Sequence, residues 1–105
     1  MNAEERSNYI KLGHTGPGWS KLITELNDKL SALDPNYTVE QIKEKFGGLR
    51  YYFSTDSNYG QEMLELEEEY ELKSYEICEL CGSEEDIAVE GSWWKTLCKN
   101  CRKDK

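Results

Sequence analysis

Apolar residues recur at steps of three and four positions in the stretch that follows Gly16-Pro17-Gly18. This period predicts an amphipathic helix with one buried stripe. Because the residue before a proline is pushed out of the helical region, we expect the helix to end at Asp34-Pro35. The prediction is a helix over about residues 18 to 33, with a stripe formed by Trp19, Leu22, Ile23, Leu26, Leu30 and Leu33.

The next segment, residues 37 to 54, is rich in β-branched and aromatic residues on both sides of Gly47 and Gly48. This composition favours strands, and a glycine pair supplies the positive backbone angles that a tight turn needs. We therefore predict a β-hairpin with strands over residues 39 to 45 and 49 to 54. A helix over residues 39 to 46 is the alternative, since that stretch also contains good helix formers.

A third periodic stretch, over about residues 58 to 76, predicts a second amphipathic helix. Its opposite face is acidic, and Lys73 is the only base among residues 61 to 90. Like charges one turn apart repel, so we expect this helix to depend on tertiary packing or on a basic partner. Its apolar stripe is Tyr59, Met63, Leu66, Tyr70 and Ile77, and its acidic face is Glu62, Glu65, Glu67, Glu68, Glu69 and Glu71.

The chain as a whole divides into three predicted parts. Residues 1 to 16 are polar and are expected to form a mobile N-terminal arm. Residues 17 to 76 are expected to form a helix-hairpin-helix core, and residues 77 to 105 a cysteine-bearing module, with a hinge near Glu76. The predicted fold class is α+β, with the acidic helix leading into the C-terminal module.

The distribution of charge along the chain argues against some classes of function. The net charge of −8 is concentrated in residues 61 to 90, which carry twelve acids and one base. A surface of that sign repels nucleic acid, so broad nucleic-acid binding is not expected. No apolar run resembles a signal peptide or a membrane helix, so we expect a cytoplasmic protein whose thiols stay reduced.

Four cysteines, Cys78, Cys81, Cys98 and Cys101, form two C-x2-C pairs separated by sixteen residues. Four soft thiolates in a tetrahedral arrangement satisfy one Zn²⁺ and leave no coordination position open, so the predicted site is structural. With short strands over residues 87 to 89 and 93 to 97, the module is predicted to be a zinc ribbon. Disulfides, free buried thiols and an iron-sulfur cluster are the weaker alternatives.

Two tryptophans precede the second cysteine pair. Neighbouring residues on a strand face opposite sides, so Trp93 and Trp94 are expected to point one into the core and one outward. The nearby bases Lys95, Lys99, Arg102 and Lys103 are expected to offset the net charge of −2 of a four-thiolate zinc site.

Four stretches of the chain are similar to known sequences: Gly18-Trp19 at the start of a leucine helix, the run QIKEKFGGLRYY over residues 41 to 52, the Cys78-x2-Cys81-Gly82 knuckle and the closing WWKTLC over residues 93 to 98. Together they resemble a family of small proteins found in bacteria, phages and prophages. The resemblance covers roughly residues 16 to 101 and is most specific in the middle run. It implies the predicted fold and a bacterial or phage origin, and it implies no particular biochemical role.

The hairpin offers a candidate ligand site. Lys43, Lys45 and Arg50 lie around the glycine turn beside Tyr52, an arrangement that suits phosphate and a stacked base. The more ordinary interpretation is that these charges form cross-strand pairs and that the tyrosines belong to the core. His14, the only histidine, is interpreted as an exposed loop residue because no nucleophile and supporting acid can be matched to it.

The leading functional hypothesis is a non-enzymatic binding protein that docks on a host or bacterial protein, since the glutamate run lacks any sign of a catalytic carboxylate pair. The candidate contact residues are Glu65, Glu68, Glu69 and Trp94. If the origin is phage, interference with a host defence or a host enzyme is the expected setting. A nucleotide-like ligand at residues 45 to 52 is the second hypothesis, and a nucleic-acid contact through residues 95 to 105 is the third.

Overall fold

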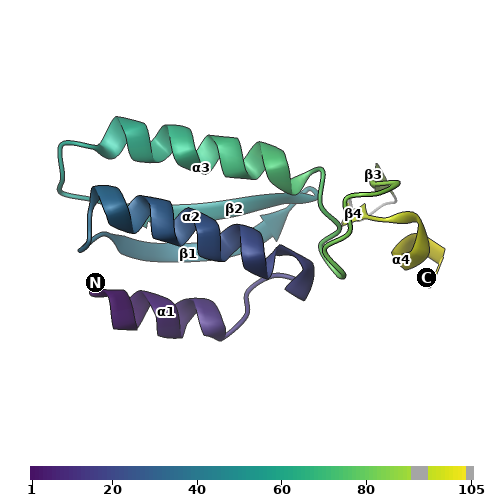
Figure 1. Cartoon of the computed structure of the whole chain (residues 1–105), viewed down its shortest axis with the longest axis horizontal. Helices are drawn as coiled ribbons and strands as arrows, with labels where there is room; N and C mark the ends of the chain where they lie inside the picture. Colours follow the sequence, from purple (N-terminus) through teal and green to yellow (C-terminus); the bar gives the residue numbers. More distant parts are fainter. Residues whose placement is uncertain (91–94, 104–105) are drawn as a thin grey trace.

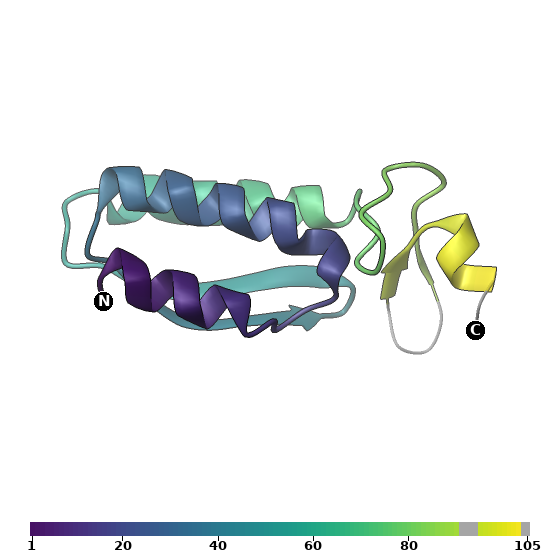
Figure 2. The ribbon, with the colours of Figure 1, turned by 60° about the horizontal axis from the view of Figure 1, so that its bottom comes forward.

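The computed structural model describes residues 1–90 and 95–103, which form an α+β fold (Figure 1). Helices α2 and α3 lie side by side on one face of the β1–β2 hairpin, and the cysteine-bearing module extends from one end of this layer (Figure 2). The predicted fold class is confirmed. The elements are α1 (Ala3–Lys11), η1 (Pro17–Trp19), α2 (Ser20–Leu33), β1 (Thr38–Lys45), β2 (Gly48–Ser54), α3 (Gly60–Ser74), β3 (Ala88–Glu90), β4 (Lys95–Leu97) and α4 (Lys99–Lys103).

Helix α2 follows the predicted periodicity. Its core residues Leu22, Ile23, Leu26 and Leu30 are buried, and Trp19 in the preceding 3-10 turn is fully buried. The backbone becomes extended at Asp34, as expected for the residue before a proline. Among the described residues, no helix is both long and apolar enough to cross a membrane.

Strands β1 and β2 form the predicted antiparallel hairpin, so the helical alternative for residues 39 to 46 is wrong. Across the hairpin, Lys43 is opposite Arg50 and Lys45 is opposite Gly48. Leu49, opposite Glu44, and Tyr51, opposite Ile42, lie on the other face, where both are fully buried against the helices. The hairpin therefore has a core face and a solvent face.

The turn of this hairpin differs from the prediction in one respect. Its two central residues are Phe46 and Gly47, both with positive φ, at 56° and 87°. Gly48 belongs to β2 and is needed for a different reason, because a Cβ there would overlap the hydroxyl of Tyr75. Of the two glycines, only Gly47 supplies a positive backbone angle.

Side chains of α3 accept hydrogen bonds from backbone amides on the outer edge of β2. The Leu49 N–H donates to Ser74 Oγ at 2.9 Å, and the Tyr51 N–H donates to Glu67 Oε1 at 3.4 Å. The hydroxyl of Ser74 donates in turn to the Glu71 carbonyl. These bonds occupy two amides that a third strand would otherwise use. Helix α3 is thus tied to the hairpin by polar contacts as well as by apolar burial.

A short chain of hydroxyl groups crosses the core. The Tyr37 hydroxyl donates to Asn27 Oδ1 at 2.6 Å and lies 2.5 Å from the Tyr51 hydroxyl. Burial raises the pKa of Tyr37 to about 12 and raises that of Tyr51 further, so both phenols stay protonated. The network joins α2, the loop after it and β2.

The N-terminal segment is not the mobile arm that we expected. Residues Ala3–Lys11 form helix α1, which begins with a capping box. The Glu5 N–H donates to Asn2 Oδ1 at 2.8 Å, and the Asn2 N–H donates to Glu5 Oε1 at 3.2 Å. The boundary predicted near residue 16 therefore separates two ordered elements.

Arg6 holds α1 to the rest of the molecule. The residue is 1% exposed, and its guanidinium donates to the carbonyls of Met1, Pro35 and Tyr37 and to the hydroxyl of Ser31. It also lies 4.4 Å from the centre of the Tyr37 ring. Polar composition suggested solvent exposure, but these acceptors from the end of α2 and the following loop enclose the arginine.

Candidate metal centre

The first cysteine pair lies in a tight loop after α3. The Cys78 N–H donates to the Ser83 carbonyl at 2.8 Å, and the Gly82 N–H donates to the Cys78 carbonyl at 2.9 Å. Gly82 has a φ of +81°, which residues with a side chain rarely adopt. The sequence therefore places a glycine where the chain must turn back so that Cys78 and Cys81 face the same point.

The second cysteine pair lies at the junction between β4 and α4. Cys98 directly follows the strand, and Cys101 lies in the first turn of the helix. The Arg102 N–H donates to the Cys98 carbonyl at 3.0 Å and closes this turn. A three-residue step on a helix brings both side chains to one side. The predicted ribbon strands are present as β3 and, from Lys95 onward, as β4, while residues 93 and 94 of the second predicted strand lie outside the described residues. The short helix α4 was not predicted.

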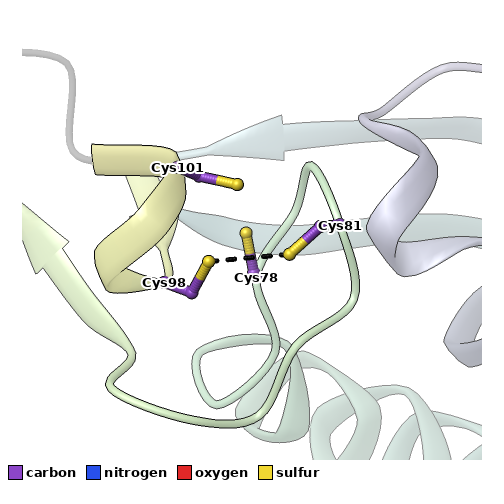
Figure 3. A group of neighbouring side chains, drawn as sticks. All are labelled: Cys78, Cys81, Cys98 and Cys101. Carbon is purple, nitrogen blue, oxygen red and sulfur yellow. Dashed lines mark hydrogen bonds between the residues drawn. The ribbon is translucent and has the colours of Figure 1, made fainter. Parts of the chain in front are cut away.

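The four sulfur atoms converge between these two loops (Figure 3). All four lie within 4.8 Å of one another, and Cys81 Sγ is 3.5 Å from Cys98 Sγ. Tetrahedral coordination with metal–sulfur bonds of about 2.3 Å requires sulfur–sulfur distances of roughly 3.8 Å. The cysteines are free thiols. These residues therefore fit a single four-coordinate metal ion, with small rotations of the side chains.

The thiols differ in acidity. Burial opposes ionisation of Cys78, but N–H groups of Cys98, Cys81 and Leu80 point at its sulfur and lower its pKa to about 6. Contacts with the thiols of Cys78 and Cys98 raise the pKa of Cys101. The Ser83 N–H favours a Cys81 thiolate, but the thiols of Cys98 and Cys78 outweigh it and raise the Cys81 pKa. A bound cation would release these protons, because metal ligands must be thiolates.

Glu79, inside the first pair, connects the module to the helical core. This residue is 5% exposed. Its carbonyl accepts the Gly18 N–H at 2.6 Å, and its carboxylate accepts the Gly16 N–H at 2.9 Å. Its own N–H donates to the Thr96 carbonyl at 3.0 Å. One residue between the ligands therefore bonds both to the start of the core and to β4.

Gly18 lies directly against this loop. A Cβ at position 18 would overlap the carbonyl oxygen of Cys78 and would also come too close to the carbonyl oxygen of Glu79 and the amide nitrogen of Gly82. The adjacent Trp19 donates from its indole nitrogen to the Ile77 carbonyl at 2.9 Å. The Gly-Pro-Gly segment is thus a packing surface for the cysteine loop as well as a turn.

The other side of the module contacts the tip of the first hairpin. Thr96 is fully buried and donates through its hydroxyl to the Gly47 carbonyl. Lys95 pairs with Glu44 at 2.6 Å and lies 3.9 Å from a carboxylate oxygen of Glu79. Lys95 is one of the bases that we expected to offset the thiolate charge, but in the structure its ammonium group pairs with carboxylates.

Sequence reasoning did not identify Glu79, Gly18 or Thr96 as part of this region. The cysteine spacing is a local pattern, whereas these three residues matter because of contacts across about sixty or fifty positions of the chain. One signal was present. Two glycines around Pro17, beyond what a turn needs, are typical of close backbone packing.

The structure brings the candidate ligand residues of the hairpin onto one face, but it does not unite them in a pocket. Lys43 Nζ lies 5.6 Å from the Tyr52 ring, and both residues line an open trough of about 650 Å³. Lys45 lies near Phe46 instead. Arg50 pairs with Glu71 at 3.2 Å, so its charge is partly balanced within the fold.

The candidate contact residues on α3 are exposed. Glu65 and Glu68 face solvent, and Glu69 pairs with Lys73 at 3.2 Å. Trp93 and Trp94, for which we predicted opposite orientations, lie outside the described residues. His14 is only half-exposed: its ring stacks on Tyr9 with centroids 4.1 Å apart.

Comparisons with protein-family models, with curated proteins and with solved structures gave no match.

Proposed function

We propose that this chain is a small, non-enzymatic binding protein whose C-terminal module is held together by one structural zinc ion. The convergence of four sulfurs from two loops carries the proposal. Four thiolates complete the coordination of the ion, so no position is left for a substrate or an activated water. Soft ligands favour zinc over magnesium or calcium, which prefer oxygen.

The zinc ion would act on the shape of the protein. Cys78 and Cys81 are in the loop that contacts Gly18, and Cys98 follows the strand that contacts Gly47. Closing the four ligands around one ion would therefore hold the end of the helical layer and the hairpin tip in fixed positions. The metal supports the surfaces of the protein and takes no part in chemistry.

We propose that these surfaces dock on another protein, with α3 as the contact. Glu65, Glu68 and Glu69 are exposed, and residues 61 to 90 carry eleven more negative than positive charges. Such a field accelerates encounters with a basic partner and disfavours nucleic acid. The resemblance to bacterial and phage proteins suggests a bacterial partner, and Trp94 remains a candidate second contact.

Affinity capture from bacterial lysate tests the docking proposal. Wild-type bait is compared with a variant carrying Glu65→Lys, Glu68→Lys and Glu69→Lys, and with a control carrying Glu40→Lys, Glu84→Lys and Glu85→Lys. The control residues are also exposed, so both variants change the net charge equally. We expect a partner that wild type and control recover and the α3 variant loses. Equal recovery by all three baits would remove α3 from the proposal.

A small anionic ligand is the second candidate, because Lys43 and Tyr52 line the same trough. Nucleotides can be screened by thermal shift with wild type and with Lys43→Ala. A ligand that stabilises wild type and not Lys43→Ala would support this candidate. Arg50→Ala serves as a comparison, since Arg50 is paired with Glu71 and lies outside the trough. The absence of any shift would leave the hairpin face without a ligand role.

A further inference from the structure

Two leucines on α3 are exposed without serving the core. Leu64 is 51% exposed and Leu72 is 68% exposed. They lie eight positions apart with Glu68 midway, so the three residues form one row at four-residue steps. Isolated surface leucines are common, but these two lie on one row of the helix, and we refer to this row of Leu64, Glu68 and Leu72 as the stripe.

The core side of α3 is a different face. Met63, Tyr70 and Ser74 are buried there. Burial of the helix against α2 and β2 is therefore complete without Leu64 and Leu72. A rise of about 1.5 Å per residue places the two leucines roughly 12 Å apart along the helix.

The charges beside the stripe are unbalanced. Elsewhere on α3, Glu71 pairs with Arg50, and Glu69 pairs with Lys73. Among residues 1–90 and 95–103, no base lies within ion-pair distance of Glu65 or Glu68. The stripe and the neighbouring Glu65 thus combine two exposed leucines with two exposed carboxylates that have no ion-pair partner in the described part of the chain. Glu65 accepts one hydrogen bond within the helix, from the Gln61 side chain at 3.4 Å.

We propose that this stripe binds a basic amphipathic helix of a protein partner. Two apolar residues of that helix, seven or eight positions apart, would contact Leu64 and Leu72, while flanking Lys or Arg side chains pair with Glu65 and Glu68. A row at four-residue steps is inclined to its helix axis by about 26°, so the partner helix crosses α3 obliquely. This inference rests on the proposed docking function and specifies the partner's chemistry.

Synthetic peptides test the stripe without knowledge of the natural partner. The probe is a lysine- and alanine-rich helical peptide of about eighteen residues with two leucines eight positions apart. The matched control has the same composition, with its leucines on opposite sides of the helix. Binding is measured by fluorescence anisotropy against wild type, Leu64→Gln with Leu72→Gln, and Leu12→Gln. Leu12 is 76% exposed on another part of the chain, and glutamine preserves helix propensity.

We expect wild type and Leu12→Gln to bind the probe about tenfold more tightly than the control peptide, because the control can present only one leucine to the stripe and burial of one further leucine contributes about that factor. The Leu64→Gln, Leu72→Gln protein should bind both peptides equally weakly. Equal binding of the two peptides by wild type would overturn the inference, as would unchanged probe binding by the double variant. Failure of wild type to bind the probe at all would overturn it too.

The two proposals fail in different ways. A captured partner that depends on Glu65, Glu68 and Glu69 but binds the double leucine variant normally would preserve docking through α3 and remove the stripe. Circular dichroism and melting of each variant establish that it is folded. Since both leucines are exposed, no change in melting is expected.

Discussion

The backbone amide of Gly18 donates to the carbonyl of Glu79 across 2.6 Å, which places the start of the helical core in contact with the cysteine loop. This contact leaves no room for a side chain at position 18. We therefore expect folding of the core to be coupled, through these backbone contacts, to binding of a metal ion by the four cysteines.

Replacement of Gly18 by alanine tests that coupling. The new methyl group would overlap the Cys78 carbonyl. We therefore expect the free energy of unfolding, measured with urea, to be about 2 kcal/mol lower in the variant than in wild type. Metal retention should fall in parallel. Gly60→Ala is the control: its nearest neighbour is Thr55 Cγ2 at 3.6 Å, an ordinary contact. Equal stability of the two variants would contradict the packing role of Gly18.

Loss of one thiolate tests the metal. In Cys98→Ala we expect no bound zinc by elemental analysis and unfolding of β3, β4 and α4, because a structural zinc ion supplies much of the folding free energy of such a module. Glu79 and Thr96 connect the module to the helical core, so unfolding of the module should also destabilise the core. We expect the melting temperature of the whole chain to fall by roughly 10 °C or more. Zinc chelation of wild type should reproduce this, and added zinc should reverse it. Wild-type protein with oxidised cysteines and no metal, or an unchanged melting curve in Cys98→Ala, would disprove the zinc site.

Glu67 makes stability depend on pH. Burial, and then repulsion from Glu71, raises its pKa above the ordinary 4.5. The native state therefore binds this proton more tightly than the unfolded chain does. Stability contributed by the protonated group is present below pH 4.5 and is lost as the pH rises through the folded pKa.

Glu67→Gln removes this penalty and retains an oxygen acceptor for the Tyr51 amide. At pH 7 we expect the variant to be more stable by about 0.3 kcal/mol, the size of one repulsive pair at four-residue spacing. The difference should vanish near pH 4. Urea unfolding at both pH values measures it, with exposed Glu65→Gln as the control. A variant less stable than wild type at pH 7 would show that the negative charge is required there.

Arg6→Ala should lower the free energy of unfolding by about 3 kcal/mol, since it leaves the buried carbonyl of Tyr37 and the partly buried carbonyl of Pro35 without their donor. Arg6→Lys should lower the free energy of unfolding by a smaller amount than Arg6→Ala, because a lysine ammonium can donate some of these hydrogen bonds but cannot reproduce the planar donor arrangement of a guanidinium. Lys11→Ala, an exposed change in the same helix, should be near neutral. Chemical denaturation of the three variants measures the order. Equal stability of Arg6→Ala and Lys11→Ala would mean that α1 is not held by this residue.

Local patterns predicted α2, the first hairpin and the cysteine cluster because each is encoded within a short stretch. The leucine period, the aromatic strands around Gly47 and the two C-x2-C pairs need no distant information. Helix α1 was missed because Arg6 finds its acceptors in residues 31 to 37, and a polar helix with a buried arginine looks like a solvated one.

The candidate site shows the same division. Spacing identified the four sulfurs, while Glu79 and Thr96 depend on contacts with Gly18 and Gly47 that only the folded chain reveals. The exposed leucines of α3 were overlooked for a related reason. A sequence period indicates which residues share a face, but burial depends on where the neighbouring elements pack.

The bonds from Leu49 and Tyr51 to Ser74 and Glu67 have a consequence for behaviour at high concentration. A two-stranded sheet presents free amides along its outer strands, and such edges recruit other chains into aggregates. Here α3 blocks one of those edges with side chains and surrounds it with negative charge. Conditions that detach α3 while leaving the hairpin paired should therefore expose this edge and allow copies of the protein to associate through β2.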